Sequence, residues 1–209
     1  MTTNRRLIPV VVASLAIVAI VVTVLMIAVI PFPEFAKPLA GEFEGRLAFV
    51  DSDNCIHVAD LATVTITEVF CESEGSFVEQ LSWADDGLTF VIYTNATILR
   101  RIDPDSGEVL ATEAIDPVDG REVPGRVASD LYMDKDGDTA VLRDGAAIVL
   151  RLEAPDRYWI EYGAERADGL YAFTDSQGRL AVFRANTTPV LIAEDVRSWG
   201  GFAWEPLSG

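Results

Sequence analysis

One stretch near the start of the chain constrains its fold more than any other. From Leu7 to Ile30 the sequence runs for 24 residues without a charged side chain. A helix of this length rises about 36 Å, which is enough to cross a hydrocarbon core of about 30 Å with some tilt. Such a helix satisfies its own backbone hydrogen bonds in lipid. The run therefore predicts a single transmembrane helix over residues 7–30.

The charges on either side of this run predict its orientation. Arg5 and Arg6 precede it, whereas the first charge after it is Glu34. Because basic residues favour the cytoplasmic side, we expect a single-pass protein of the cytoplasmic membrane. It would have a cytoplasmic stub at 1–6, an uncleaved signal anchor at 7–30, a Pro-rich connector at 31–43 and an exported domain at 44–209. The alternative is a cleaved secretory signal, which would normally have a shorter apolar run and an A-x-A site.

The exported region is strongly acidic. The chain has a formal net charge of −17, and all 33 acidic residues lie at or after Glu34. Such a surface repels nucleic acid and anionic lipid, and it attracts basic partners, although acidic residues also serve solubility. We therefore expect no nucleic-acid binding. The expected partners are other membrane or envelope proteins, including a larger membrane complex or a basic exported protein.

Helical periodicity disappears after the connector. Short runs of β-branched and aromatic residues alternate with clusters of turn-forming residues, which predicts an all-β domain without a second long helix. Four apolar runs are predicted as inner strands, each followed by a turn and a second strand: Arg46–Asp51 with Cys55–Leu61, Leu88–Tyr93 with Thr97–Asp103, Thr139–Arg143 with Ala147–Glu153, and Leu170–Thr174 with Leu180–Arg184.

The two cysteines lie in two of these strand-like runs, in a region where oxidation is permitted. Pairing the runs about Thr63 sets four pairs of residues opposite each other: Leu61 and Thr65, Ala59 and Thr67, His57 and Val69, and Cys55 and Cys71. The Cα atoms of opposed residues are about 4.5–5.5 Å apart, which overlaps the disulfide range. This predicts a Cys55–Cys71 disulfide. The alternative is a pair of buried free thiols, since a metal site would lack ligands.

An aromatic residue precedes a glycine by four or five positions three times, at Trp83 and Gly87, Tyr132 and Gly137, and Trp204 and Gly209. This pattern is typical of a hairpin between two strands of one blade. The segment Leu81–Val109 resembles a blade of the TolB-like and WD40-like β-propeller families. The matching residues are Trp83, Asp86 and Gly87 in a first turn, and Asp103, Ser106 and Gly107 in a second.

The resemblance implies a small β-propeller of about four blades whose usual role is protein binding, and a β-sandwich is the alternative fold. The first repeat, which begins at Arg46, lacks its innermost strand. We expect the C-terminal piece Gly201–Pro206 to supply it, while the third repeat lacks a convincing outer strand. Four tryptophans are expected to pack between blades, and the alternative is that they line a recognition surface: Trp83, Trp159, Trp199 and Trp204.

The sequence contains few candidate catalytic or metal-binding residues. Asp134, Asp136 and Asp138 alternate as weak candidates for a Ca²⁺ site. Thr139 stands where an EF-hand loop needs Gly, however, so a hairpin turn is the favoured interpretation. His57 is the only histidine, and we expect it to be a packed or half-exposed strand residue and not a general base. No sequence motif of a hydrolase, zinc protease or nucleotide-binding enzyme occurs.

These observations predict no catalytic residue and no cofactor. The predicted function is a membrane-anchored, non-catalytic interaction domain on the outer face of the cytoplasmic membrane, such as an accessory subunit of an integral membrane complex. The alternative is an envelope hydrolase or ligand-binding sensor that uses a propeller funnel. Carboxylates converging at one mouth of the funnel, with shifted pKa values, would favour that alternative.

Overall fold

The computed structural model of the chain describes residues 31–72, 76–84, 86–93, 96–115, 131–197 and 201–207. The predicted transmembrane segment at 7–30 lies outside these ranges and stays a prediction. No helix within the described ranges is long and apolar enough to cross a bilayer. The described chain is built of β-strands, as the alternation of apolar runs and turn residues predicts.

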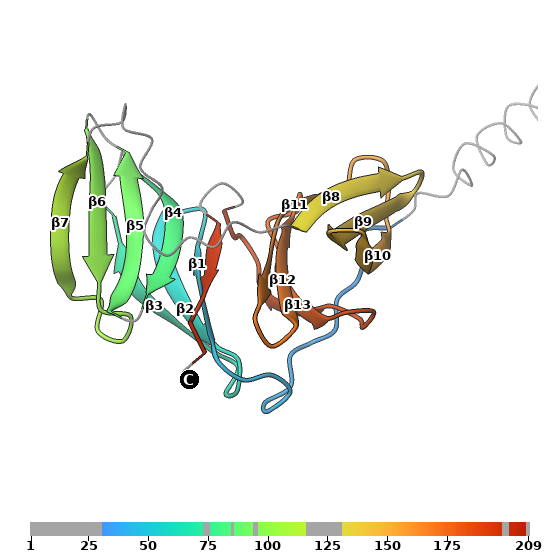
Figure 1. Cartoon of the computed structure of the whole chain (residues 1–209), viewed down its shortest axis with the longest axis horizontal. Coiled ribbons are helices and arrows are strands. Elements are labelled where there is room, and N and C mark those ends of the chain that lie inside the picture. Colours follow the sequence, from blue (N-terminus) through green and yellow to red (C-terminus); the bar gives the residue numbers. More distant parts are fainter. Residues whose placement is uncertain are drawn as a thin grey trace, which may run out of the picture.

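The strands form four antiparallel sheets, each named here by its first strand in chain order (Figure 1). The β1 sheet contains β15 (Phe202–Trp204), β1 (Arg46–Val50), β2 (Cys55–Asp60) and β3 (Thr65–Cys71). The β4 sheet contains β4 (Phe77–Ala84), β5 (Gly87–Tyr93), β6 (Thr97–Ile102) and β7 (Val109–Ile115). The β8 sheet contains β8 (Leu131–Asp136), β9 (Thr139–Asp144) and β10 (Ala147–Glu153). The β11 sheet contains β11 (Ile160–Arg166), β12 (Leu170–Asp175), β13 (Leu180–Arg184) and β14 (Val190–Ala193).

All eight strands predicted by residue range are present, each within one residue of its predicted ends. The C-terminal piece pairs with β1, with Phe202 opposite Phe49 and Trp204 opposite Leu47, so it supplies the inner strand of the first sheet as predicted. The β8 sheet has three strands in the described part of the chain, consistent with the missing outer strand of the third repeat. Four sheets of this kind fit a small β-propeller and not a two-sheet sandwich.

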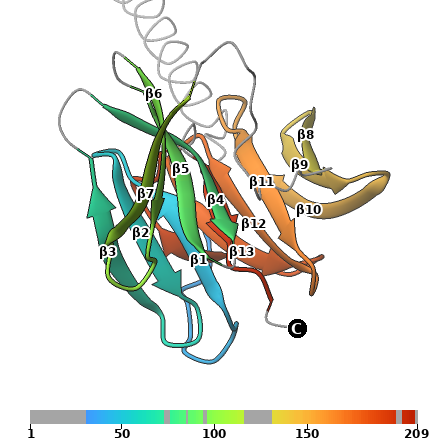
Figure 2. The same ribbon diagram turned by 60° about the vertical axis from the view of Figure 1, so that its left-hand side comes forward.

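Three apolar clusters join the sheets face to face. One joins the β4 and β1 sheets, a second joins the β1 and β11 sheets, and a third joins the β11 and β8 sheets. The β11 sheet is therefore buried on both faces: Ala172 and Val182 face the β1 sheet, whereas Phe173 and Phe183 face the β8 sheet. Among the described residues no such cluster joins the β4 and β8 sheets, which lie at opposite ends of the row in Figure 1. Figure 2 shows the β4 sheet in front of the β1 sheet, with the β8 sheet still apart on the right.

The β2–β3 hairpin contains the predicted disulfide, and the Cys55 and Cys71 sulfurs are 2.07 Å apart. Between the turn and the disulfide, the predicted register of this hairpin is wrong by one residue of β3. Ala59 pairs with Ile66, not Thr67, and His57 pairs with Glu68, not Val69. Asp60, not Leu61, is the partner of Thr65, because the loop holds four residues. A bulge beyond His57 then absorbs one residue of β3 and returns Cys55 to a position opposite Cys71.

The Pro-rich connector packs against the sheets. Ala36 forms a parallel bridge with Val190, in which the Ala36 amide donates to the carbonyl of Pro189 at 2.8 Å. Phe32 and Phe35 pack against the cluster between the β8 and β11 sheets. The connector is thus part of the folded domain from Phe32 onward.

Candidate functional site

Two hollows lie on either side of the segment Glu205–Leu207 that follows β15. They have volumes of about 530 and 600 Å³. The loops around them come from the β1, β4 and β11 sheets and meet at the lower edge of the sheets, beside the C-terminal label of Figure 1. We call this region the acidic mouth, because its carboxylates outnumber its guanidinium groups: Glu42, Glu44, Asp86, Asp103, Asp105, Asp168 and Glu205 against Arg46, Arg166 and Arg184.

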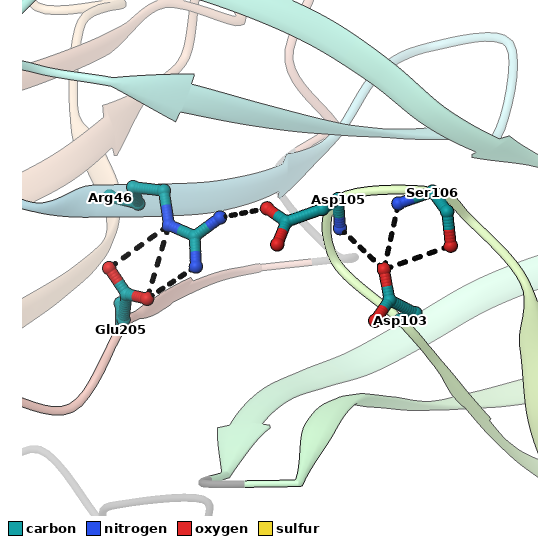
Figure 3. Close-up of polar contacts among 5 residues, drawn as sticks. All are labelled: Arg46, Asp103, Asp105, Ser106 and Glu205. Atoms are coloured by element: carbon teal, nitrogen blue, oxygen red, sulfur yellow. Dashed lines mark hydrogen bonds and ion pairs between the residues drawn. The ribbon is translucent and has the colours of Figure 1, made fainter.

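Arg46, the first residue of β1, joins the sides of the mouth (Figure 3). Its Nε lies 3.1 Å from both carboxylate oxygens of Glu205, and its Nη1 donates to Asp105. Its guanidinium also lies 5.0 Å from the ring centre of Trp83 on β4. The hydrogen bonds to Glu205 and Asp105 raise the pKa of Arg46 above its ordinary value, so this cation persists at any physiological pH.

Asp103 builds the loop that presents Asp105 to Arg46. Its Oδ1 accepts hydrogen bonds from the amides of Asp105 and Ser106, at 3.0 and 2.8 Å, and from the Ser106 hydroxyl at 2.9 Å (Figure 3). The hydrogen bonds from Ser106 are the main cause that lowers the pKa of Asp103. This loop is the second of the two turns that carry the propeller resemblance, and the Asp103 carboxylate fixes its backbone conformation.

The smaller hollow, of about 530 Å³, is organised around Arg166, the last residue of β11. Its Nε and Nη2 donate to the two carboxylate oxygens of Asp168 at 2.7 and 2.8 Å, and its Nη1 donates to the carbonyl of Glu44 at 2.7 Å. The hydrogen bond from Arg166 lowers the pKa of Asp168. Gly45 has a φ of +89°, and a Cβ there would lie 2.3 Å from Nη1 of Arg166. The glycine thus leaves space for the guanidinium.

The two hollows repeat one arrangement. The guanidinium of Arg166 lies 5.0 Å from the ring centre of Trp204 on β15, just as that of Arg46 lies over Trp83 on β4. In each case a tryptophan on the inner strand of one sheet is covered by an arginine from the neighbouring sheet. Both contacts are cation–π interactions that also orient the guanidinium toward its carboxylate.

The electrostatics of the mouth favour recognition of positive charge. A general acid needs a carboxyl group with a raised pKa, because it must hold a proton near neutral pH. The two mouth carboxylates with shifted pKa values, Asp103 and Asp168, both shift downward. They remain ionised, and several others stand at the rim: the side chain of Asp105 is 75% exposed and that of Asp86 is 61% exposed.

The weak metal candidates do not converge in the structure. Asp134 and Asp136 lie on β8, and Asp138 follows in the β8–β9 turn. One carboxylate oxygen of Asp134 lies 3.5 Å from Nε of Arg143. Among the described residues, one group of three metal-ligand types lies close enough to share an ion: Cys55, Glu68 and Cys71. Its cysteines form the disulfide and offer no thiolate.

The other residues singled out in the sequence have structural surroundings. His57 Nε2 lies 2.7 Å from an Asp51 oxygen, and its ring stacks on Phe49. Trp83 is buried between the β4 and β1 sheets and Trp204 packs beside the β1–β11 cluster, as expected. Trp159 differs, because it is 52% exposed. Trp199 lies outside the described residues.

Sequence reasoning missed Arg46, Arg166 and Glu205 as members of a common site. Arg46 and Glu205 are 159 positions apart, so no local pattern connects them. The one usable signal was the prediction that the C-terminal piece completes the first sheet, which brings Glu205 beside the start of β1.

Comparisons with known proteins give little further constraint. No family model matches the chain, and no curated protein matches it. The solved structures that are similar in part include a chain of the mitotic checkpoint complex and the C-terminal WD40 domain of Sif2. The first shares 13% identity at a TM-score of 0.30, with 76% of this chain and 53% of that chain covered. The second shares 14% identity at a TM-score of 0.23, with 78% and 51% covered. This chain spans about half the length of each, and its fold assignment rests on its own sheets.

Proposed function

We propose that this protein is a membrane-anchored, non-catalytic interaction domain. Its acidic mouth binds a basic segment of another membrane or exported protein on the outer face of the cytoplasmic membrane. The observation that carries the proposal is the gathering of carboxylates from three sheets around the two hollows beside Glu205–Leu207. The apolar run Leu7–Ile30 supplies the anchor in this proposal.

The charge of the mouth supports a basic partner. Glu42 and Glu44 are exposed at the rim of one hollow, and Asp86 and Asp105, which also pair with Arg101 and Arg46, are exposed at the rim of the other. Complementary charges of this kind raise the rate of association and orient the partner. The less exposed carboxylates of Glu205 and Asp168, which hold Arg46 and Arg166, keep the shape of the mouth fixed before a partner arrives.

The lowered pKa values favour binding over acid catalysis. A hydrolase that used this mouth would need one carboxyl group held protonated, whereas Asp103 and Asp168 are stabilised in their ionised forms. An accessory subunit of an integral membrane complex is the specific form of the proposal, because it uses both the anchor and the mouth.

Affinity purification of the full chain from detergent-solubilised membranes tests this function. The test variant Glu42→Gln/Glu44→Gln removes two exposed carboxylates at the mouth, and the matched control Glu68→Gln/Glu153→Gln removes two exposed carboxylates elsewhere. We expect one protein partner to co-purify in fixed ratio with the wild type and the control. Its recovery with the mouth variant should fall about five- to tenfold, since each exposed pair contributes up to about 1 kcal/mol. Recovery of the protein alone, or equal recovery with both variants, would contradict the proposal.

A further inference from the structure

The connector leaves no free tether between the predicted membrane span and the sheets. The Phe32 ring lies 6.2 Å from that of Tyr158, and the Arg157 guanidinium lies 4.9 Å from the Phe32 ring centre. Arg179 donates a hydrogen bond to the carbonyl of Pro33 at 2.8 Å. The connector is therefore held against the domain two residues after the last residue of the apolar run.

The following residues continue this contact. The Phe35 ring packs edge-on against Phe173 at 5.6 Å, and the Arg179 guanidinium lies 4.2 Å from the Phe35 ring centre. Arg179 is itself held by Asp175, whose side chain is fully buried, through a 2.6 Å contact. This set, formed by Phe32, Phe35, Asp175, Arg179 and Tyr158, is called the connector clamp below.

The clamp limits how far the nearby surface can lie from a bilayer. Two residues of extended chain reach about 7 Å. If the span ends at Ile30, the surface around Phe32 lies within that distance of the end of the hydrocarbon core, and so within the headgroup layer. Figure 1 shows the connector beginning beside β9 and β10, at the right-hand end of the row of sheets.

The surface beside the clamp carries exposed apolar side chains among charged ones. Trp159 follows the clamped Tyr158 and is 52% exposed, and its Nε1 donates to Glu161 at 3.2 Å. Met133 is 39% exposed and lines a hollow of about 270 Å³ with Trp159, Lys135 and Asp134. Tryptophan is enriched at headgroup level because its ring is apolar while its N–H remains hydrogen-bonded.

We infer that the Trp159 surface rests on the same bilayer that the chain is anchored in, so that the domain is held in one orientation with its acidic mouth away from the lipid. This inference rests on the anchor of the proposed function. The mouth lies at the lower edge of the sheets in Figure 1, apart from the connector's start, which keeps its negative charge away from anionic headgroups.

Tryptophan quenching by lipid tests the inference. The full chain is reconstituted in phosphatidylcholine vesicles whose acyl chains carry bromine, a quencher of indole fluorescence. The apolar run contains no tryptophan, so any quenching reports the exported region alone. We expect quenching in the wild type, loss of most of it in Trp159→Phe, and its retention in Trp83→Phe, since Trp83 is buried and borders the mouth.

A second variant supplies a matched probe. Phe77 is 48% exposed on β4, in the sheet at the other end of the row, so Trp159→Phe/Phe77→Trp moves an exposed tryptophan away from the connector. This variant should show no more quenching than Trp159→Phe. Equal quenching in the wild type and Trp159→Phe, or none in the wild type, would overturn the inference.

Flotation of the same vesicles distinguishes a failure of the proposed membrane anchor from a failure of the Trp159 contact alone. A protein that floats with the vesicles but is not quenched leaves the anchor intact and overturns only the membrane contact of Trp159. A protein that does not float contradicts the anchor and, with it, the inference. Concentration-dependent cross-linking of vesicle-bound protein through the Trp159 surface, without quenching, would instead assign that surface to a second copy of the chain.

Discussion

The acidic mouth and the connector clamp use the same side-chain chemistry to different ends. In both, an arginine lies over an aromatic ring and pairs with a carboxylate: Arg46 over Trp83 with Glu205 in the mouth, and Arg179 over Phe35 with Asp175 in the clamp. The partners differ in solvent access. The side chain of Asp175 is 0% exposed, whereas that of Glu205 is 30% exposed.

This difference in burial separates a structural pair from a recognition surface. A buried carboxylate that loses its cation is left as an unpaired charge in a medium of low dielectric. Removing the cation therefore destabilises the folded state strongly. An exposed pair contributes little to stability because water screens it. Its carboxylates, however, remain available to a partner. The comparison assigns stability to the clamp, and it leaves the exposed carboxylates of the mouth available for the binding proposed above.

The largest expected effect is the loss of the clamp arginine. Arg179→Ala leaves Asp175 buried without its cation and should lower the free energy of unfolding by about 3–5 kcal/mol. Urea unfolding of the full chain in detergent micelles measures this change. Arg184→Ala serves as the control, since the Arg184 side chain is 52% exposed, and should cost less than about 1 kcal/mol. Equal losses for the two variants would contradict a structural role for the clamp.

Removing the ring under Arg179 should have the next largest effect. Phe35 is partly buried against Phe173, so Phe35→Ala should lower the free energy of unfolding by about 2–3 kcal/mol, below the range for a fully buried phenylalanine. Leu39→Ala, at a connector position that is 68% exposed, is the control for the same measurement and should stay within about 0.5 kcal/mol of the wild type. A loss no larger than that of the control would show that the connector is a loose tether.

The matching arginine of the mouth should matter less to stability. Arg46→Ala removes two solvent-accessible ion pairs and a ring contact, and should cost about 1 kcal/mol in the same urea titration. Partner recovery should change more than stability does, because Glu205 and Asp105 lose the cation that positions them. A stability loss as large as that of Arg179→Ala would remove the distinction between the two regions.

The smallest effect concerns acid stability. The folded state lowers the pKa of Asp168 below its ordinary value of 3.8. Its contribution is therefore present above about pH 4 and is lost as the pH falls through the lowered folded pKa. Asp168→Asn should show a shallower loss of stability on acidification than the wild type, measured as urea midpoints across an acid pH series. Parallel curves for the two proteins would refute this contribution.

Most of the elements that the sequence could predict have partners near in sequence. The exception is the C-terminal strand, whose pairing with β1 was predicted from the strand missing in the first repeat. The apolar runs, their turns and the cysteine pair all lie within hairpins, and they appear where they were predicted. The register of the β2–β3 hairpin was wrong because the bulge opposite His57 leaves no mark in an alternating pattern.

The clamp and the mouth depend on contacts between distant residues. Nothing in the Pro-rich connector shows that Phe35 packs against Phe173, or that Arg179 bonds to Pro33, since these pairs form only when the β11 sheet is in place. The turn motif at Asp103 was visible in the sequence, but its role is to present Asp105 to Arg46 on another sheet. Local signals therefore predict the sheets, and the packing of the sheets creates the site.

The most direct test of the whole account places a photoreactive side chain in each region of the full-length protein in its native membrane. Leu207, which is 49% exposed at the mouth, and Trp159, beside the clamp, are each replaced in turn by benzoylphenylalanine. Irradiation should yield one discrete protein adduct from position 207 and only lipid adducts from position 159. A discrete protein adduct from position 159 with none from position 207 would contradict the assignment of binding to the mouth and of the membrane contact to the Trp159 surface.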